Sequence, residues 1–164
     1  MKLCYFIRFF ISYKVMTSYS SANEVLTGLW LGNIIDSQNK EFLKKIDVVI
    51  NCSKDIAFSV TYTNNIRIPI EDDLQKTEMV KLYSMLPDIT GRIHDYLSNN
   101  KKILIHCYAG KQRSAAVIVA YCIRYLGLTM HDAVVLLKTR RMIVFTPFIN
   151  FKSPLVLFER NYGT

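Results

Sequence analysis

The sequence of 164 residues contains only four cysteines, and they stand far apart at positions 4, 52, 107 and 122. The chain therefore has no CxxC pair and no clustered spacing of metal ligands, which argues against a zinc module and against a disulfide scaffold. Glycine and proline are also scarce, with six and four copies, which excludes a collagen-like chain. We expect neither a metal nor a cofactor.

The sequence also has little that favours a membrane span. The apolar N-terminal stretch LCYFIRFFISY, residues 3–13, is too short to cross a bilayer, which takes about 20 residues. One interpretation of this stretch is a signal peptide, with small residues near Ser20 and Ala22 as the cleavage site, but Arg8 interrupts the apolar run.

A second interpretation of residues 1–23 is an amphipathic helix followed by a polar linker. In a helix, five apolar side chains would share one face, namely Leu3, Phe6, Ile7, Phe10 and Ile11. That face needs a partner, which is either the chain's own domain or a second copy of the chain. In the second case the segment is a dimerisation element. A third interpretation places the true start of the protein at Met16.

The composition and charge indicate one compact domain with anionic binding partners. Hydrophobic residues make up 51% of the chain and charged residues 21%, which suits a substantial core and argues against disorder. Lys and Arg number 21 against 13 Asp and Glu, so the formal charge is +8. Nucleic acid, acidic lipid and phosphorylated protein are the candidate partners. Nucleic acid is the weakest of these, because the basic residues are scattered and no recognised nucleic-acid motif is present.

Strand and helix patterns alternate along residues 24–164. Runs rich in β-branched and alternating apolar residues predict strands at 26–33, 46–51, 65–70 and 102–105. Helical patterns follow at 37–46 with Ser37 as the cap, at 77–97 with a break or kink at Pro87, at 114–126 before Gly127, at 129–140 capped by Thr129, and after Pro147. We therefore expect a single α/β domain with a central, mostly parallel sheet of about five strands flanked by helices.

The junction between the 102–105 strand and the 114–126 helix carries the chemistry. Ligands of parallel sheets bind beyond the carboxyl ends of the strands, and this junction reads HCYAGKQRS at residues 106–114. A short loop entering a helix can turn several backbone N–H groups inward and form an anion pocket of the size of phosphate. Gly110 allows the tight backbone, and Arg113 can grip two phosphate oxygens with parallel donors. The loop Tyr108, Ala109, Gly110, Lys111, Gln112 and Arg113 is therefore our candidate phosphate site.

Cys107 at the base of this loop is the candidate nucleophile. The dipoles that bind phosphate also stabilise a thiolate, which can attack phosphorus and form a cysteinyl-phosphate that water later hydrolyses. Ser114 can donate a hydrogen bond to the departing sulfur. We expect His106 to orient the loop rather than act as a general base, because an ionised cysteine has no proton to remove.

The leaving oxygen still needs a proton, and an acidic pair can supply it. Asp72 and Asp73 follow the 65–70 strand, so they should lie at the same sheet edge as the cysteine loop. The residues alone do not choose between these two carboxylates.

With these motifs in hand, the sequence resembles the cysteine-dependent dual-specificity protein phosphatases, and among them the small poxviral members, over about residues 24–160. Residues 106–114 match the family motif HCxxGxxRS at every defined position, and three other segments resemble family strands or loops: LWLGN at 29–33, VIN at 49–51 and IPIED at 68–72. The resemblance implies a protein-tyrosine-phosphatase-like fold and hydrolysis of phosphotyrosine and of phosphoserine or phosphothreonine in proteins. It also favours Asp72 over Asp73 as the acid, and it supports dimerisation through the N-terminal helix.

Two departures from the family pattern bear on function. Where relatives often end with PNxxFxxQL, this chain has PFINFKSPL at 147–155, which keeps the Phe and the Leu but lacks the usual Asn and Gln. Lys111 resembles a lysine that some lipid-directed relatives carry, so a phosphoinositide or other phospholipid phosphatase is the alternative function. A working thiolate needs a reducing compartment, so we expect a cytoplasmic protein, in the host-cell cytoplasm and the virion if the chain is viral.

Overall fold

The structure is a computed structural model, and it describes residues 21–59 and 64–163. The predicted N-terminal helix and its dimer contact fall mainly on residues 1–20, outside the described residues, and stay predictions. No helix in the described ranges is both long and apolar enough to span a membrane.

Five short strands form one sheet in the order β1-β2-β5-β3-β4. Their bounds are β1 (Asn23–Leu26), β2 (Leu29–Gly32), β3 (Val48–Asn51), β4 (Asn65–Arg67) and β5 (Ile103–His106). β1 pairs antiparallel with β2, and all other neighbouring strands pair in parallel. The predicted α/β fold with a mostly parallel sheet is therefore confirmed.

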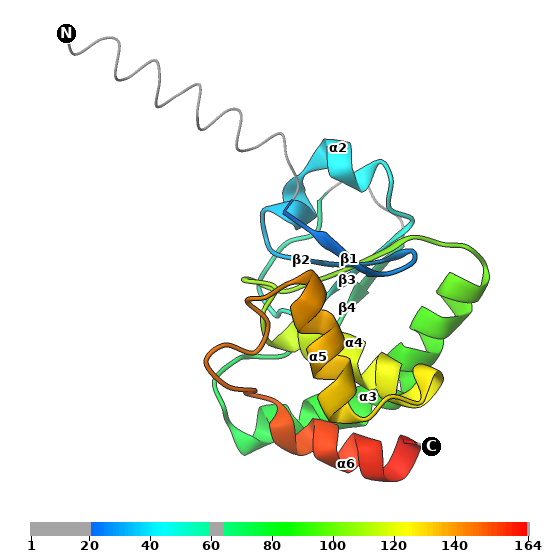
Figure 1. The fold of residues 1–164 in the computed structure, drawn as a ribbon. Coiled ribbons are helices and arrows are strands. Elements are labelled where there is room, and N and C mark those ends of the chain that lie inside the picture. Colours follow the sequence, from blue (N-terminus) through cyan, green and yellow to red (C-terminus); the bar gives the residue numbers. More distant parts are fainter. Residues whose placement is uncertain (1–20, 60–63, 164) are drawn as a thin grey trace, which may run out of the picture.

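Four helices cover one face of this sheet and a short one lies over the other (Figure 1). The helices are α2 (Lys40–Leu43), α3 (Lys76–Ser98), α4 (Arg113–Leu126), α5 (Met130–Arg140) and α6 (Lys152–Tyr162), and a 3-10 helix spans Asp36–Gln38. The main core lies between the sheet and α3 to α6, whereas Phe42 and Leu43 of α2 pack on Val49 and Leu104 on the opposite face. Because β3 and β5 are covered on both sides, all four residues of each are buried, which explains their continuous apolar sequences.

The strand predicted at 26–33 is confirmed as β2, but β2 begins only at Leu29, and the preceding strand β1 was not predicted. Thr27 and Gly28 form a turn between β1 and β2, and Gly28 has a φ of 78°, which glycine adopts without steric cost. Glu24 Oε1 accepts a hydrogen bond from the Gly28 N–H at 2.8 Å and closes the turn. β1 and β2 therefore form a hairpin, and β1, of which only Leu26 falls in the predicted strand, is the antiparallel edge strand.

Two predictions about helices also need correction. Asn39, not Ser37, caps α2, since its Oδ1 accepts from the Phe42 N–H at 3.1 Å. α3 runs unbroken through Pro87, although this residue has no N–H to donate. The Pro87 carbonyl accepts from Arg124 Nη1 of α4 at 2.6 Å, and the apolar side chains before and after Pro87 are buried in the main core. Packing on both sides therefore holds the helix together despite one missing backbone bond.

Candidate active site

The loop between β5 and α4 forms the floor of a pocket at the carboxyl edge of the sheet. Cys107 follows β5 directly, and Arg113 is the first residue of α4. Gly110 has a φ of 64°, and a Cβ at this position would collide with the backbone carbonyl of Gly32. Only glycine therefore lets the loop pack against the end of β2, as its place in the motif predicts.

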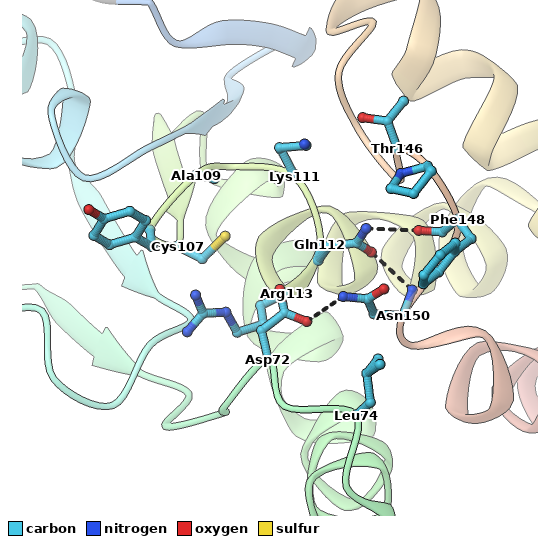
Figure 2. Close-up of a pocket in the computed structure, with 12 residues that line it drawn as sticks. Asp72, Leu74, Cys107, Ala109, Lys111, Gln112, Arg113, Thr146, Phe148 and Asn150 are labelled. Carbon is cyan, nitrogen blue, oxygen red and sulfur yellow. Dashed lines mark hydrogen bonds between the residues drawn. The ribbon is translucent and has the colours of Figure 1, made fainter.

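The pocket has a volume of about 390 Å³ and gathers residues from three separate parts of the chain (Figure 2). The acidic loop after β4, the cysteine loop and the segment before α6 all contribute. The lining residues are Asp72, Leu74, Cys107, Tyr108, Ala109, Lys111, Gln112, Arg113, Thr146, Pro147, Phe148 and Asn150. The structure thus brings the predicted loop, the predicted cysteine and one of the two predicted carboxylates together.

The environment of Cys107 favours a thiolate. Its side chain is buried, and Ser114 Oγ donates a hydrogen bond to its Sγ at 3.2 Å. Burial opposes ionisation, but hydrogen bonds from the side chain and backbone of Ser114, the charge of Arg113 and the Lys111 backbone together lower the pKa of the Cys107 thiol. Burial instead raises the pKa of Cys52 and raises that of Cys122 to about 12. Of the three cysteines in the described ranges, Cys107 is therefore the one whose surroundings favour the thiolate.

Arg113 lies beside the Cys107 thiol and keeps an N–H donor that no described residue accepts. Its Nη1 donates to the backbone carbonyl of Ile70 at 3.1 Å, which fixes the guanidinium relative to the acidic loop. Its Nε is buried and has no hydrogen-bond partner among the described residues. A buried guanidinium N–H next to a thiolate is suited to an anionic oxygen, because an unpaired donor of this kind is otherwise costly.

The two carboxylates of the acidic loop have different surroundings. Asp72 lines the pocket, and its Oδ1 accepts a hydrogen bond from Asn150 Nδ2 at 2.7 Å. Asp73 is not among the pocket residues, and its Oδ1 accepts from the Gln75 N–H at 3.0 Å, at the start of α3. The geometry therefore places Asp72, rather than Asp73, with Cys107 and Arg113.

His106 is fully buried at the end of β5, between Gly32 and Asn51 of the neighbouring strands. Neither ring nitrogen has a hydrogen-bond partner within the described part of the chain. Burial lowers the pKa of His106 to about 4, and the nearby Cys107 backbone offsets this only in part. The imidazole is therefore neutral at pH 7.

This buried imidazole predicts that folding weakens in mild acid. The unfolded chain binds a proton on His106 below about pH 6.5, whereas the folded chain binds it only below about pH 4. Between these values the unfolded state holds more protons, so the free energy of unfolding falls as the pH falls. We expect a loss of about 2 kcal/mol from this group between pH 7 and pH 5, measured by urea unfolding at both values.

Replacing His106 with Asn should flatten this pH dependence, because the titrating group is gone. The same replacement at His131, which is exposed on α5, should leave it as in the wild type. A His106→Asn variant that loses as much stability as the wild type would contradict the assignment.

Arg141 supports the cysteine loop in a way that sequence patterns did not predict. It is buried, and its Nε donates to the Gly110 carbonyl at 3.0 Å. Its Nη1 also donates to the Ser21 carbonyl at 2.9 Å and to Asn23 Oδ1 at 2.8 Å. No local signal marks this role, because the groups that it joins lie far apart in the sequence.

Gln112 and Asn150 are the other pocket contacts that local sequence does not reveal. Gln112 was predicted only as a loop residue, and Asn150 stands in the stretch that departs from the family pattern. Both side chains make hydrogen bonds across the pocket, and the fold alone brings them together. In the described ranges, no group of three or more His, Cys, Asp or Glu side chains could hold a metal ion.

Comparison with known proteins shows which family the chain resembles. Residues 29–161 match the model of the dual specificity phosphatase catalytic domain. The chain is 35% identical over 141 residues to the protein named tyrosine phosphatase 123R of Invertebrate iridescent virus 6, covering 84% of this chain and 91% of that protein. It is 32% identical over 143 residues to human dual specificity protein phosphatase 9, covering 84% of this chain but only 36% of that longer protein.

The fold also matches a solved poxviral structure. The OH1 protein from the Orf virus, described as a tyrosine phosphatase with triple substrate specificity, superposes with a TM-score of 0.66 at 19% identity, covering 85% of this chain and 87% of that chain. The predicted resemblance, including its viral members, is thereby confirmed. The chain belongs to the dual specificity phosphatase family of enzymes, and residues 29–161 match its catalytic domain.

Proposed function

We propose that the chain hydrolyses phosphotyrosine and phosphoserine or phosphothreonine in proteins through a cysteinyl-phosphate formed on Cys107. One observation carries this proposal: a thiol of lowered pKa lies in the same pocket as an arginine with a buried free donor and a carboxylate. The +8 charge of the chain favours encounters with phosphorylated partners.

In the first step the Cys107 thiolate attacks phosphorus in line with the leaving oxygen. The S–P bond forms as the P–O bond to the substrate side chain breaks, and Asp72 donates its proton to that oxygen. Arg113 and the loop N–H groups bind the equatorial oxygens, where negative charge is concentrated.

In the second step water hydrolyses the cysteinyl-phosphate. The Asp72 carboxylate now accepts a proton from the attacking water, so the same group acts first as acid and then as base. The S–P bond breaks, and the hydrogen bond from Ser114 stabilises the sulfur as it leaves as a thiolate. Inorganic phosphate is released and the enzyme is restored.

The walls of the pocket suit phosphorylated side chains of proteins. Three large apolar residues, Leu74, Tyr108 and Phe148, are exposed and line the pocket beside Lys111. Apolar walls can contact the ring of phosphotyrosine or the methyl group of phosphothreonine.

Side-by-side turnover on phosphotyrosine peptides, phosphothreonine peptides and short-chain phosphoinositides tests the substrate class. We expect both peptides to be hydrolysed in preference to the lipids, and a strong preference for lipids would overturn the assignment.

Replacing Asp72 with Asn should slow hydrolysis according to the leaving group. A general acid is worth about 100-fold or more when the leaving oxygen is basic, as in tyrosine, and little when it is acidic. We therefore expect kcat/KM, which reports formation of the cysteinyl-phosphate and not its hydrolysis, to fall about 100-fold on a phosphotyrosine peptide. On an aryl phosphate of an acidic phenol, kcat/KM should change by less than about threefold.

Asp73→Asn is the matched control, because both carboxylates are exposed and adjacent but only Asp72 lines the pocket. It should leave both rates close to wild type. A larger loss from Asp73→Asn, or equal losses on the two substrates from Asp72→Asn, would assign the proton to another group.

The same thiolate chemistry bears on the cellular location of the enzyme. A reactive thiolate persists in a reducing compartment, which supports a cytoplasmic location. The similarity to a protein of an iridescent virus supports a viral origin, and with it the host-cell cytoplasm. Dimerisation through residues 1–23 belongs to the same proposal and is tested by comparing the oligomeric state of the full chain with that of a chain starting at Met16.

A further inference from the structure

The segment before α6 is tied to the cysteine loop by both ends of one amide. The Gln112 side chain is buried, its Nε2 donates to the Phe148 carbonyl at 2.8 Å, and its Oε1 accepts from the Asn150 N–H at 3.1 Å. An amide provides one donor and one acceptor, so it can satisfy a backbone carbonyl and a backbone N–H together, which a carboxylate cannot. The backbone of Asn150 is therefore held in a fixed position relative to the loop that contains Cys107.

The side chain of Asn150 extends this connection to the acidic loop. Its Nδ2 donates to Asp72 Oδ1 at 2.7 Å, as Figure 2 shows. Within the described residues this is the sole hydrogen bond to the Asp72 carboxylate. A continuous path thus runs from the cysteine loop through Gln112 and Asn150 to the exposed carboxylate on the opposite wall of the pocket.

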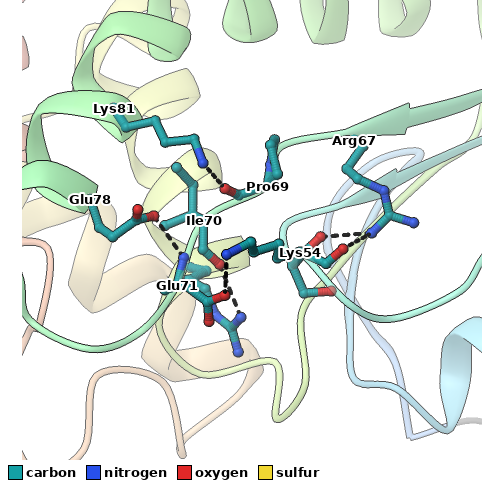
Figure 3. Close-up of polar contacts among 9 residues, drawn as sticks. Lys54, Arg67, Pro69, Ile70, Glu71, Glu78 and Lys81 are labelled. Atoms are coloured by element: carbon teal, nitrogen blue, oxygen red, sulfur yellow. Dashed lines mark hydrogen bonds and ion pairs between the residues drawn. The ribbon is translucent and has the colours of Figure 1, made fainter.

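The backbone that precedes Asp72 is held by contacts of another kind (Figure 3). Arg113 binds the Ile70 carbonyl, and the Glu71 N–H donates to Glu78 Oε2 at 2.8 Å. Lys54 and Glu71 form an ion pair at 3.5 Å across the same loop. These contacts hold the backbone of the acidic loop but do not involve the Asp72 side chain, whose one hydrogen bond among the described residues comes from Asn150.

We propose that Asn150 is a positioning residue that sets both the rotamer and the protonated oxygen of Asp72. This inference rests on the proposed function, in which Asp72 is the general acid. Within a protonated carboxyl group the oxygen without the proton is the stronger acceptor, so the N–H of Asn150 favours Oδ1 as the unprotonated oxygen. The proton for the leaving group is then carried on Oδ2. Asn150 lies in the stretch 147–155, at a position that the family pattern leaves undefined.

Asn150→Ala tests the inference because it removes the side-chain bond alone. The backbone N–H of residue 150 remains, so the bond to Gln112 and the position of the segment are kept. We expect kcat/KM on a phosphotyrosine peptide to fall about tenfold, since a misplaced acid loses part of its effect. On an aryl phosphate with an acidic phenol, kcat/KM should stay within about twofold of wild type.

The matched control is Asn161→Ala. Asn161 Nδ2 donates to Tyr83 Oη at the same distance of 2.7 Å and joins α6 to α3, and neither residue lines the pocket. This variant should hydrolyse both substrates like the wild type. If Asn161→Ala reproduces the leaving-group-dependent loss, the effect is structural and the proposal is wrong.

A double-mutant cycle separates positioning from a general loss of structure. In an Asp72→Asn background, adding Asn150→Ala should change neither rate, because there is no acid left to position. Additive losses, or equal losses on both substrates from Asn150→Ala alone, would overturn the proposal.

Asn150→Asp is a second variant of nearly the same shape that replaces the donor by an acceptor. It should show the same selective loss even if the alanine variant folds poorly. A wild type without phosphatase activity would instead refute the proposed function, so the two failures are distinguishable.

Discussion

A Cys107→Ser variant is expected to lose phosphatase turnover by about 10⁴-fold or more while it still binds vanadate or tungstate. The hydrogen bonds from Ser114 and the charge of Arg113 lower the pKa of a thiol, but a hydroxyl starts too far above neutral pH for the same groups to ionise it. The loop and its donors are unchanged, so anion binding should survive. Initial rates on a phosphotyrosine peptide and calorimetric titration with the oxyanion measure the two effects.

Cys122→Ala is the control for this variant. Cys122 lies buried in α4, the helix that follows the loop, and burial raises its pKa to about 12. The substitution should cost some stability but leave kcat within about twofold, because the residue does not line the pocket. Retained turnover in Cys107→Ser, or lost turnover in Cys122→Ala, would contradict the assignment of Cys107 as the nucleophile.

The second large effect is expected for Arg113→Lys, which should lower kcat/KM by about 10²-fold to 10³-fold at constant net charge. Lysine offers a point charge instead of a planar fork, so it cannot bind two equatorial oxygens and the Ile70 carbonyl at once. Vanadate affinity should fall in parallel, because a pentacoordinate vanadate carries the same equatorial oxygens as the reacting phosphate.

Arg140→Lys provides the comparison, since Arg140 is an exposed basic residue at the end of α5. Its replacement should be nearly silent in kcat/KM and in vanadate affinity. If Arg113→Lys were equally silent, the arginine would act only as a general positive charge, and the clamp would be the wrong description.

The chemistry of the site could be predicted from sequence because it is encoded locally. HCYAGKQRS places the nucleophile, the loop and the arginine within nine consecutive residues, and the buried patterns of β5 and α4 on either side fix their place in the fold. The acidic loop needed one more inference, that parallel strands end at the same edge. The structure supports that inference, since Asp72 after β4 lines the pocket with Cys107.

The contacts that hold the site together could not be predicted in this way. Arg141 on the Gly110 carbonyl and Asn150 on Asp72 join segments separated by 31 and 78 positions, and no local pattern encodes such pairs. The hairpin at Gly28 and the unbroken α3 were missed for a related reason. In the first, one glycine within an alternating pattern reverses the chain, and in the second, tertiary packing outweighs the local effect of Pro87.

The most direct measurement is to trap the covalent intermediate. Asp72→Asn enzyme, in which hydrolysis of the intermediate lacks its base, is mixed with a labelled aryl phosphate of an acidic phenol, quenched within milliseconds and mapped by peptide mass spectrometry. The account predicts one phosphate on the peptide that contains Cys107, formed as fast as the phenol is released and absent from a Cys107→Ser enzyme. Phosphate on another residue, or rapid release of phenol with no phosphorylated peptide, would contradict it.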